Sequence, residues 1–235
     1  MTLSAPIHVL KSRAKRQARL QGMPLHKALD AVAHSEGFQS WSHLVFASHK
    51  SRSAEALQGK LTPGKMVLLG ARPRQGKTML GLELLARLAA QGRPAWFFSL
   101  DFHERGVASA FDRLGLTAQA KSVAVDTSDA INADHIVNRL ASAPPQPVFV
   151  VDYLQLLDQR RSHPRLDAQI KALRAHVRAS GATGIVLSQI DRAFELTEKA
   201  MPTADDIRMP NPVDLRDFDT HCFLNEGQLA IADAA

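Results

Sequence analysis

The sequence predicts an α/β fold in which a mostly parallel, twisted sheet is flanked by helices and preceded by a small helical module. Four apolar runs are continuous rather than alternating, which is typical of parallel strands buried on both faces: VLLG, WFFSL, VFVVD and GIVLSQ. Strand and helix patterns alternate between residues 66 and 188, as in a doubly wound sheet with right-handed crossovers. The length of 235 residues suits one such domain with a small appendage.

The composition indicates a globular protein of the cytoplasm, with 45% hydrophobic and 22% charged residues. The single cysteine, Cys222, cannot form an internal disulfide, which fits a reducing compartment and argues against a metal site built from cysteines. The ten histidines show no metal-binding spacing. No run reaches 18 apolar residues, and the first twenty residues are too basic for a signal-peptide core, so no membrane partner is expected.

Basic charge is concentrated near the N-terminus. Residues 1–65 hold ten Lys or Arg against three Asp or Glu, a balance of +7, whereas the net charge of the whole chain is +6. This asymmetry predicts a nucleic-acid or other polyanion partner for the N-terminal piece. A basic helix face that is simply solvated is the alternative interpretation.

Three short helices are predicted in this piece, over residues 6–20, Leu25–His34 and Trp41–Ser48. Lys11, Lys15 and Arg19 recur every four residues in the first helix and therefore line one of its faces, which makes them candidate nucleic-acid contacts. The pattern fits a DNA-binding bundle and equally a protein-docking module. Because so small a bundle has a thin core, we expect it to pack on the main domain.

Residues 49–60 are polar and small, which is typical of a linker. The chain is therefore divided into a basic helical module at 1–50, a linker at 51–62 and a main domain at 63–235. Strands of the main domain are predicted at Met66–Leu69, Ala95–Leu100, Ser122–Val125, Pro147–Val151, Gly184–Ser188, Phe218–Leu224 and Gln228–Ile231. Helices are predicted at Lys77–Gln91, Glu104–Leu114, Ala133–Ser142 and Leu166–Ser180. The last two strands are expected to form a hairpin across Glu226 and Gly227.

A phosphate-binding loop is predicted between the first of these strands and the following helix. It comprises Gly70, Ala71, Arg72, Pro73, Arg74, Gln75, Gly76, Lys77 and Thr78. Backbone N–H groups of such a loop and the positive end of the helix dipole bind phosphate, and Gly76 lets the backbone approach it. Lys77 is expected to reach the β- and γ-phosphates of ATP, and the Thr78 hydroxyl to ligate Mg²⁺. The strict pattern has Gly where this chain has Ala71.

Three further strands end in polar residues that would share the carboxyl edge of the sheet with this loop. Asp152 ends an apolar strand about 75 residues downstream and is expected to hold Mg²⁺ through water. Asp101 is a candidate general base for the attacking water, and the Gln189 amide a candidate contact to the γ-phosphate. For Asp101 and Gln189 the alternative is a polar residue that merely caps a strand.

These motifs resemble those of the DnaB-type replicative helicases. The matching strings are GARPRQGKT, FFSLDF, VFVVDYLQLL, GIVLSQIDRAFE and ADDIRMP followed by DFDTHCFL, in order over roughly residues 60–225. The resemblance implies a RecA-like P-loop core, ATP hydrolysis, and a homo-oligomer, in that family a ring, on single-stranded DNA. The N-terminal strings LKSRAKRQARL and GFQSWSHL resemble a segment at the start of plasmid-associated bacterial proteins, which makes a replication or plasmid-associated protein a candidate partner.

The chain departs from that family in two places that bear on catalysis. Asp101 stands where the family has Glu as general base, and the shorter side chain withdraws the carboxylate by roughly 1.5 Å, one C–C bond. The Lys-x-Arg-x-Gly element that reaches a neighbouring subunit's nucleotide in that family is not found after Leu224. We therefore expect slow or partner-stimulated ATP hydrolysis rather than unwinding, with an ATP-gated interaction protein or DNA-binding adaptor as the alternative.

Basic residues after the Asp152 strand are candidate contacts to DNA phosphates. Arg160, Arg161 and Arg165 cluster there, with His163 between them. No aromatic residue accompanies the cluster, so base stacking is not indicated. A solvated charged loop is the competing interpretation.

Overall fold

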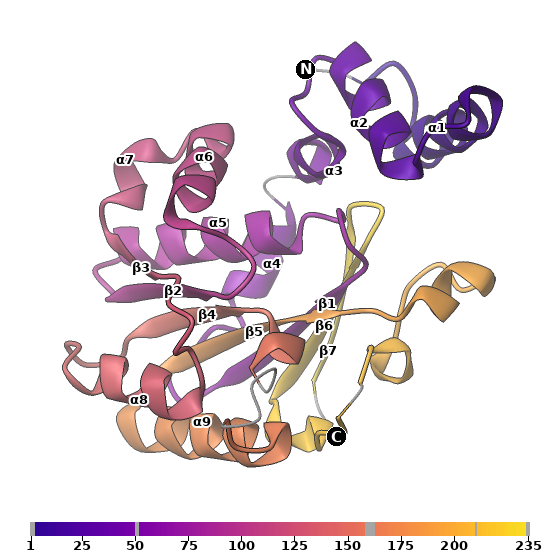
Figure 1. The fold of residues 1–235 in the computed structure, drawn as a ribbon. Helices are drawn as coiled ribbons and strands as arrows, with labels where there is room; N and C mark the ends of the chain where they lie inside the picture. The colour runs from indigo at the N-terminus through magenta and orange to yellow at the C-terminus, as the bar shows by residue number, and fades with distance from the viewer. Residues whose placement is uncertain (1–2, 50–51, 158–162, 210, 234–235) are drawn as a thin grey trace.

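The computed structural model describes residues 3–49, 52–157, 163–209 and 211–233. Its centre is a seven-stranded sheet in the order β3-β2-β4-β5-β1-β6-β7 (Figure 1). The strands are β1 Met66–Ala71, β2 Ala95–Ser99, β3 Val123–Asp126, β4 Val148–Asp152, β5 Thr183–Gln189, β6 Thr220–Asn225 and β7 Gln228–Asp233. β1 to β6 run parallel and β7 pairs antiparallel with β6. The predicted α/β class, the parallel sheet and the final hairpin are confirmed.

The sheet is covered by helices on both faces, which explains why its strands are apolar without alternation. In Figure 1, α5, α6 and α7 lie above the sheet, and α8 and α9 lie below it. The first layer comprises α5 Lys77–Ala90, α6 Glu104–Leu114 and α7 Thr117–Ala120, and the second α8 Ala133–Ala141 and α9 Leu166–Ser180. Each layer has its own apolar cluster, and alternate residues of β1 and β4 point into one or the other. A parallel strand therefore buries every side chain.

The segment predicted as a linker differs in the structure. A helix, α4 Arg52–Gln58, forms there, and Ala54, Leu57 and Leu61 join the apolar cluster under α5. The reason is that these three residues provide an apolar face within an otherwise polar stretch. α4 therefore packs into the core of the main domain, in a stretch where the sequence pattern indicated a linker and no helix.

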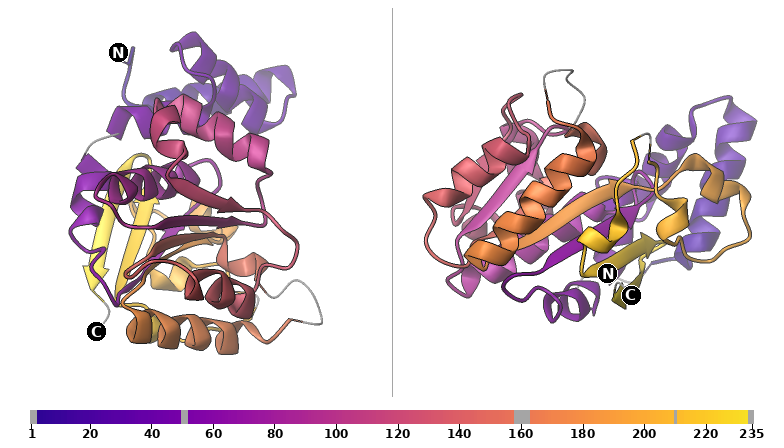
Figure 2. Two further views of the ribbon diagram at one scale, coloured as in Figure 1. Left: turned by 90° about the vertical axis from the view of Figure 1, so that its left-hand side faces the viewer. Right: turned by 90° about the horizontal axis from the view of Figure 1, so that it is seen from below.

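The N-terminal helices are confirmed as a three-helix bundle. They are α1 Ile7–Gln21, α2 Leu25–Ser35 and α3 Trp41–His49. Their buried residues form a separate cluster that includes Leu10, Leu29, Trp41 and Leu44. The chain leaves α1 through Gly22 at φ 60°, a backbone conformation that favours glycine. The bundle sits above the carboxyl edge of the sheet and packs on α5 through α3, as its thin core required (Figures 1 and 2).

Short 3-10 helices complete the connections on the C-terminal side of the chain. They are η1 Leu154–Leu156, η2 Arg192–Leu196, η3 Ala204–Asp206 and η4 Leu215–Asp217. The sequence patterns did not indicate any of them, because a single turn is too short to show a period. Within the described residues, no helix combines the length and the apolar character needed to cross a membrane.

Gly184 in β5 leaves room for side chains of the two neighbouring strands. A Cβ at Gly184 would lie 2.8 Å from Cζ of Phe149 and 3.3 Å from Cγ of Met66, both fully buried. We predict that Gly184→Ala lowers the free energy of unfolding by about 1–3 kcal/mol, because overpacking forces buried side chains from their positions. Urea denaturation measures this change. Gly59→Ala is the control, since its Cβ would meet no atom closer than 3.9 Å, and an equal loss in both variants would contradict the packing argument.

Candidate functional site

The loop that joins β1 to α5 begins later than the sequence pattern suggested. Gly70 and Ala71 lie within β1 and are buried. A Cβ at Gly70 would lie 3.0 Å from the Phe223 ring, so the structure gives this glycine a packing role against β6. The loop itself runs from Arg72 to Gly76. Gly76, at φ 89°, turns the chain into α5.

Side chains of the loop are held by neighbouring segments. Arg72 donates from Nη1 to the Ile190 carbonyl at 2.9 Å and from Nε to Glu195 at 3.1 Å. Gln75 is buried, and its Oε1 accepts the N–H of Glu226 at 2.8 Å. Because α5 begins at Lys77, the N–H groups of its first turn have no partner within the helix. These contacts fix a loop next to a helix N-terminus, an arrangement that attracts anions.

Lys77, Thr78 and Asp152 converge below this loop. The Thr78 hydroxyl donates to Asp152 Oδ2 at 2.8 Å, and Lys77 Nζ lies 3.6 Å from Asp152 Oδ1. Lys77 Nζ also lies 5.0 Å from the centre of the Tyr153 ring. The three predicted residues, on β4 and the first turn of α5, are therefore brought together.

Asp152 is the buried carboxylate of the site. It is fully buried, and burial raises its pKa above the ordinary value despite the opposing effects of Lys77 and Thr78. Its Oδ1 accepts no hydrogen bond among the described residues. A buried carboxylate oxygen without a hydrogen bond, beside a hydroxyl, is a donor set that suits Mg²⁺, directly or through water. Thr78 and Asp152 are the residues that would hold the ion.

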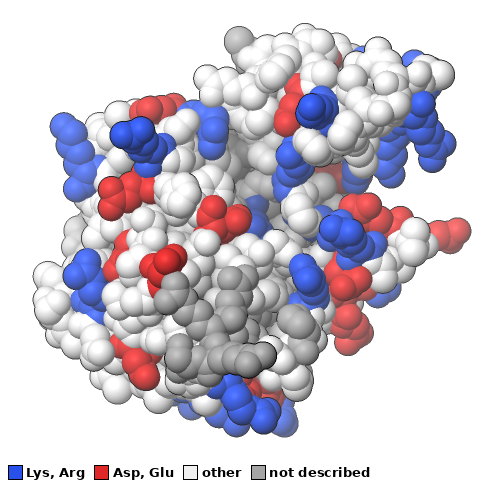
Figure 3. All heavy atoms as spheres, in the orientation of Figure 1, with Lys and Arg blue, Asp and Glu red and all other residues white. Residues whose placement is uncertain are grey.

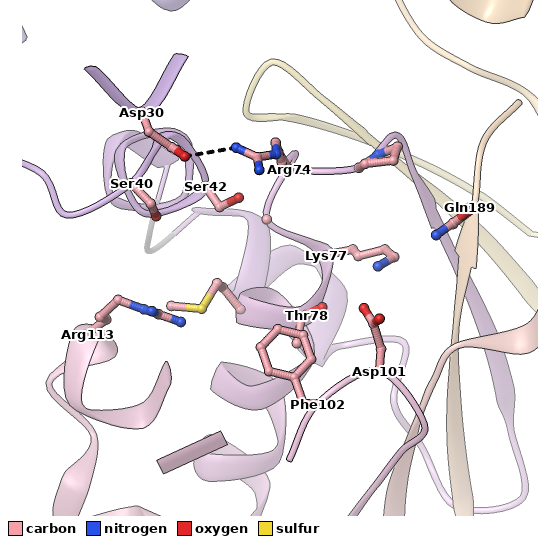
Figure 4. Close-up of a pocket in the computed structure, with 13 residues that line it drawn as sticks. Asp30, Ser40, Ser42, Arg74, Lys77, Thr78, Asp101, Phe102, Arg113 and Gln189 are labelled. Carbon is pink, nitrogen blue, oxygen red and sulfur yellow. Dashed lines mark hydrogen bonds and ion pairs between the residues drawn. The ribbon is translucent and has the colours of Figure 1, made fainter. Parts of the chain in front are cut away.

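Asp101 lines the pocket together with Lys77 and Thr78, and its carboxylate points toward the Lys77 side chain (Figure 4). It follows β2, where the Ser99 hydroxyl accepts the N–H groups of Asp101 and Phe102 at 3.2 and 2.9 Å. The carboxylate is exposed, and its charge helps to raise the pKa of Asp152. Asp101 therefore lies close enough to Asp152 for the two carboxylates to interact electrostatically.

Gln189, at the end of β5, lines the same pocket and belongs to a network that the sequence patterns did not indicate. Its Oε1 accepts from Arg208 Nη1 at 3.4 Å, and its backbone carbonyl accepts the Arg208 N–H at 2.8 Å. Gln155 donates to the Ser188 hydroxyl at 2.9 Å and to the Arg208 carbonyl at 2.7 Å. Arg208 and Gln155 lie within the quoted strings ADDIRMP and VFVVDYLQLL, which was the only sequence signal for them.

The pocket has a volume of about 420 Å³ and extends beyond the loop to the N-terminal bundle. Asp30, Ser40 and Ser42 of the bundle line it together with Met79 and Arg113. None of these five residues was predicted as a site residue, because no sequence pattern joins the bundle to the sheet edge. Figure 4 shows the bundle residues and Arg113 on the side of the pocket away from Gln189.

The predicted nucleic-acid contacts are scattered. Arg160 and Arg161 lie outside the described residues. The Arg165 side chain is 82% exposed and pairs with Asp167 at 3.1 Å. Lys15 and Arg19 are exposed on α1, where Figure 3 shows Lys and Arg side chains gathered at the edge of the bundle. Lys11 instead pairs with Glu226 in the β6–β7 turn at 2.8 Å.

Comparisons with known proteins agree with this geometry. A family model described as an AAA domain matches residues 33–209. A replicative DNA helicase DnaB of Synechocystis sp. is 27% identical over an alignment of 187 residues, with a coverage of 66% of this chain and 21% of the helicase. The chain thus spans about a fifth of the length of that relative.

Two solved structures share the fold at low sequence identity. One, described as an ATPase domain, superposes with a TM-score of 0.56 at 18% identity, covering 68% of this chain and 69% of that domain. A DnaB-like replicative helicase, described with its interactions with primase, superposes with a TM-score of 0.59 at 14% identity, covering 91% of this chain and 64% of that one. These similarities support the fold that the sequence patterns predicted.

The raised pKa of Asp152 predicts how stability depends on pH. Below the ordinary pKa of an aspartate, about 3.9, folded and unfolded chains both keep this proton. As pH rises from there, the unfolded chain releases the proton first, so folding becomes less favourable until the folded carboxyl also ionises. We predict that the free energy of unfolding of Asp152→Asn, relative to that of wild type, increases as pH rises above about 4. Urea denaturation without nucleotide measures the difference, and a difference that is constant with pH would contradict the prediction.

Proposed function

Because the chain belongs to the AAA domain family, as a P-loop ATPase domain distantly related to DnaB replicative helicases, we propose that it binds ATP with Mg²⁺, hydrolyses it slowly or on stimulation by a partner, and acts on DNA. The observation that carries the proposal is the convergence of Lys77, Thr78 and Asp152 below the loop, with Asp101 and Gln189 lining the same pocket.

Binding of the triphosphate is supported by the chemistry of the loop. The N–H groups at the start of α5 and the Lys77 ammonium group provide positive charge where phosphates would lie. Thr78 and Asp152 would hold Mg²⁺, which when bound supplies positive charge that neutralises the β- and γ-phosphates. Lys77 is nine-tenths buried, so its charge is poorly screened by solvent.

Hydrolysis is supported by the position of Asp101. In the proposed reaction Asp101 accepts a proton from a water molecule, the water oxygen bonds to the γ-phosphorus, and the bond to the β-phosphate oxygen breaks to release ADP. Gln189, held by Arg208, would orient the attacking water or contact the γ-phosphate. Because Asp is one carbon shorter than Glu, a slow rate is proposed.

A nucleotide-gated interaction protein is the second candidate. The observation that favours it is the contact between the loop and the N-terminal bundle, where Arg74 Nη1 pairs with Asp30 Oδ2 at 3.0 Å. A change in this loop on binding nucleotide would alter the bundle's contacts directly. In this case ATP would bind without appreciable turnover.

Lengthening the side chain at position 101 separates the two candidates. If Asp101 is a misplaced base, we predict that Asp101→Glu raises ATP turnover by on the order of tenfold or more, because an ångström of misplacement costs up to about a hundredfold in rate. Steady-state phosphate release, with and without single-stranded DNA, measures it. Lys77→Ala in both backgrounds should abolish turnover and weaken ATP binding. No turnover in either protein, despite ATP binding, would favour the gated interaction protein.

DNA as a partner is supported by the charge of the bundle. Residues 1–65 carry the basic excess of the chain, and Lys15 and Arg19 are exposed on one face of α1. Their exposure lets both side chains approach a phosphate backbone, whereas Lys11 is engaged by Glu226. The matched relative is itself named a replicative DNA helicase. We propose single-stranded DNA as the polyanion and the exposed face of α1 as its contact.

The salt dependence of DNA binding tests this contact. Each phosphate contact to single-stranded DNA contributes a slope of about −0.7 to the logarithm of affinity against the logarithm of salt concentration. We predict that Lys15→Ala with Arg19→Ala reduces the magnitude of the slope by about 1.4, measured by fluorescence anisotropy on a labelled oligonucleotide. Lys121→Ala with Lys171→Ala removes the same charge elsewhere and serves as control. Equal slopes in all three proteins would exclude α1 as the contact.

A further inference from the structure

The pocket next to the P-loop is built from two parts of the chain that are distant in sequence. Lys77, Thr78, Asp101 and Gln189 line its inner end, at the edge of the sheet. Ser40 and Ser42, at the start of α3, line its outer end (Figure 4). The phosphate-binding groups therefore fill only part of a cavity of about 420 Å³.

One set of contacts that holds the bundle over this pocket centres on the Asp30 carboxylate. Asp30 Oδ2 accepts from Arg74 Nη1 in the P-loop at 3.0 Å, and Asp30 Oδ1 accepts the N–H of Trp41, the first residue of α3, at 3.0 Å. Arg74 Nη1 also donates to the His26 carbonyl at 3.3 Å. Asp30 thus fixes the start of α3, and with it Ser40 and Ser42, relative to the loop.

A second contact, between α1 and the β6–β7 turn, restrains the bundle further. Lys11 on α1 pairs with Glu226 at 2.8 Å, and the N–H of Glu226 donates to Gln75 in the P-loop, also at 2.8 Å. The bundle therefore reaches the same loop by two routes. These two contacts fix the position of the bundle over the pocket.

The orientation of a bound nucleotide follows from where its reacting end must lie. Asp152, Asp101 and Gln189 stand at the sheet edge, so the γ-phosphate and Mg²⁺ belong there. The nucleoside then leaves the loop in the opposite direction, along the first turn of α5. That direction leads to Met79, Arg113, Ser40 and Ser42.

We propose that the N-terminal bundle forms the nucleoside-binding wall of the ATP site, with Ser40 and Ser42 facing the ribose or base opposite Met79 and Arg113. Serine hydroxyls donate and accept hydrogen bonds, a planar guanidinium stacks on a ring, and a thioether makes adaptable apolar contacts. Asp30 is a positioning residue that holds this wall against the P-loop. The inference rests on the proposed nucleotide binding and extends it to a part of the chain outside the P-loop motifs.

Two ligands that differ only in the nucleoside test this inference. ATP and inorganic tripolyphosphate share the phosphate chain, so both are titrated with Mg²⁺ into the full chain by calorimetry. The Ser40 hydroxyl accepts the His43 N–H at 3.2 Å and so also caps α3, which makes Ser42→Ala the cleaner variant. We expect Ser42→Ala to weaken ATP binding by up to about tenfold, the effect of one lost hydrogen bond. Tripolyphosphate binding should change by less than about twofold, since it lacks the groups that the serines contact. Arg113→Ala should give the same split between the ligands.

Controls separate this inference from the proposed function. Ser12→Ala alters an exposed serine of α1 that bonds only the His8 carbonyl among the described residues, and should leave both affinities unchanged. Lys77→Ala should weaken both ligands. If the Ser42→Ala variant binds ATP as tightly as wild type, or loses both ligands equally, the inference is overturned while ATP binding stands. If wild type binds neither ligand, the proposed function fails and the inference fails with it.

Variants of Asp30 test its positioning role separately, because Asp30 holds the start of α3 against the P-loop. Asp30→Ala should weaken ATP binding without weakening tripolyphosphate binding, since Arg74 would be released toward the phosphates. Asp30→Asn keeps an oxygen for the Trp41 N–H and should recover part of the ATP affinity. An Asp30→Ala variant that binds ATP as wild type does would contradict the positioning role.

Discussion

Asp152 carries a carboxylate that the fold buries completely and compensates with one hydroxyl and one ammonium group. Burying a charge is costly unless it is paired, and here the pairing is incomplete, which is why burial raises the pKa of this group. The rest of the site follows from this constraint. β4 must end at the carboxyl edge of the sheet, and α5 must begin with Lys77 and Thr78 above it. Such incomplete pairing lowers stability, and under the proposed function this cost is offset when a cation and phosphates bind.

The sheet supplies the rigidity that such a site needs. β5 lies between β1 and β4, so the P-loop strand and the Asp152 strand are separated by the strand that ends at Gln189. Close packing fixes these strands, since Gly184 leaves room for Phe149 and Gly70 leaves room for Phe223. Parallel strands with a fixed register bring their carboxyl ends to one edge. The groups that converge there are consequently held by the core, which does not depend on a ligand.

The N-terminal bundle has a different physical character from the main domain. Its small apolar cluster is separate from both clusters of the sheet, and polar contacts at Asp30 and Lys11 link it to the P-loop. Partly exposed ion pairs contribute little to stability, typically below about 1 kcal/mol. A bundle docked in this way is well placed to respond to what occupies the pocket beneath it. This is the physical reason that an ATPase and a nucleotide-gated interaction protein are both chemically reasonable functions for the chain.

The sequence by itself determined the α/β class, the order of motifs along the chain, and the residues Lys77, Thr78, Asp101, Asp152 and Gln189 that the fold brings into one site. These followed from local pattern, because an apolar run that ends in a polar residue places that residue at the sheet edge. The sequence did not indicate α4, whose short apolar face lies in a polar stretch. It gave no sign that Asp30, Ser40, Ser42 and Arg113 line the pocket. Only the tertiary structure decided this, since no periodicity records which surfaces meet when separate elements dock.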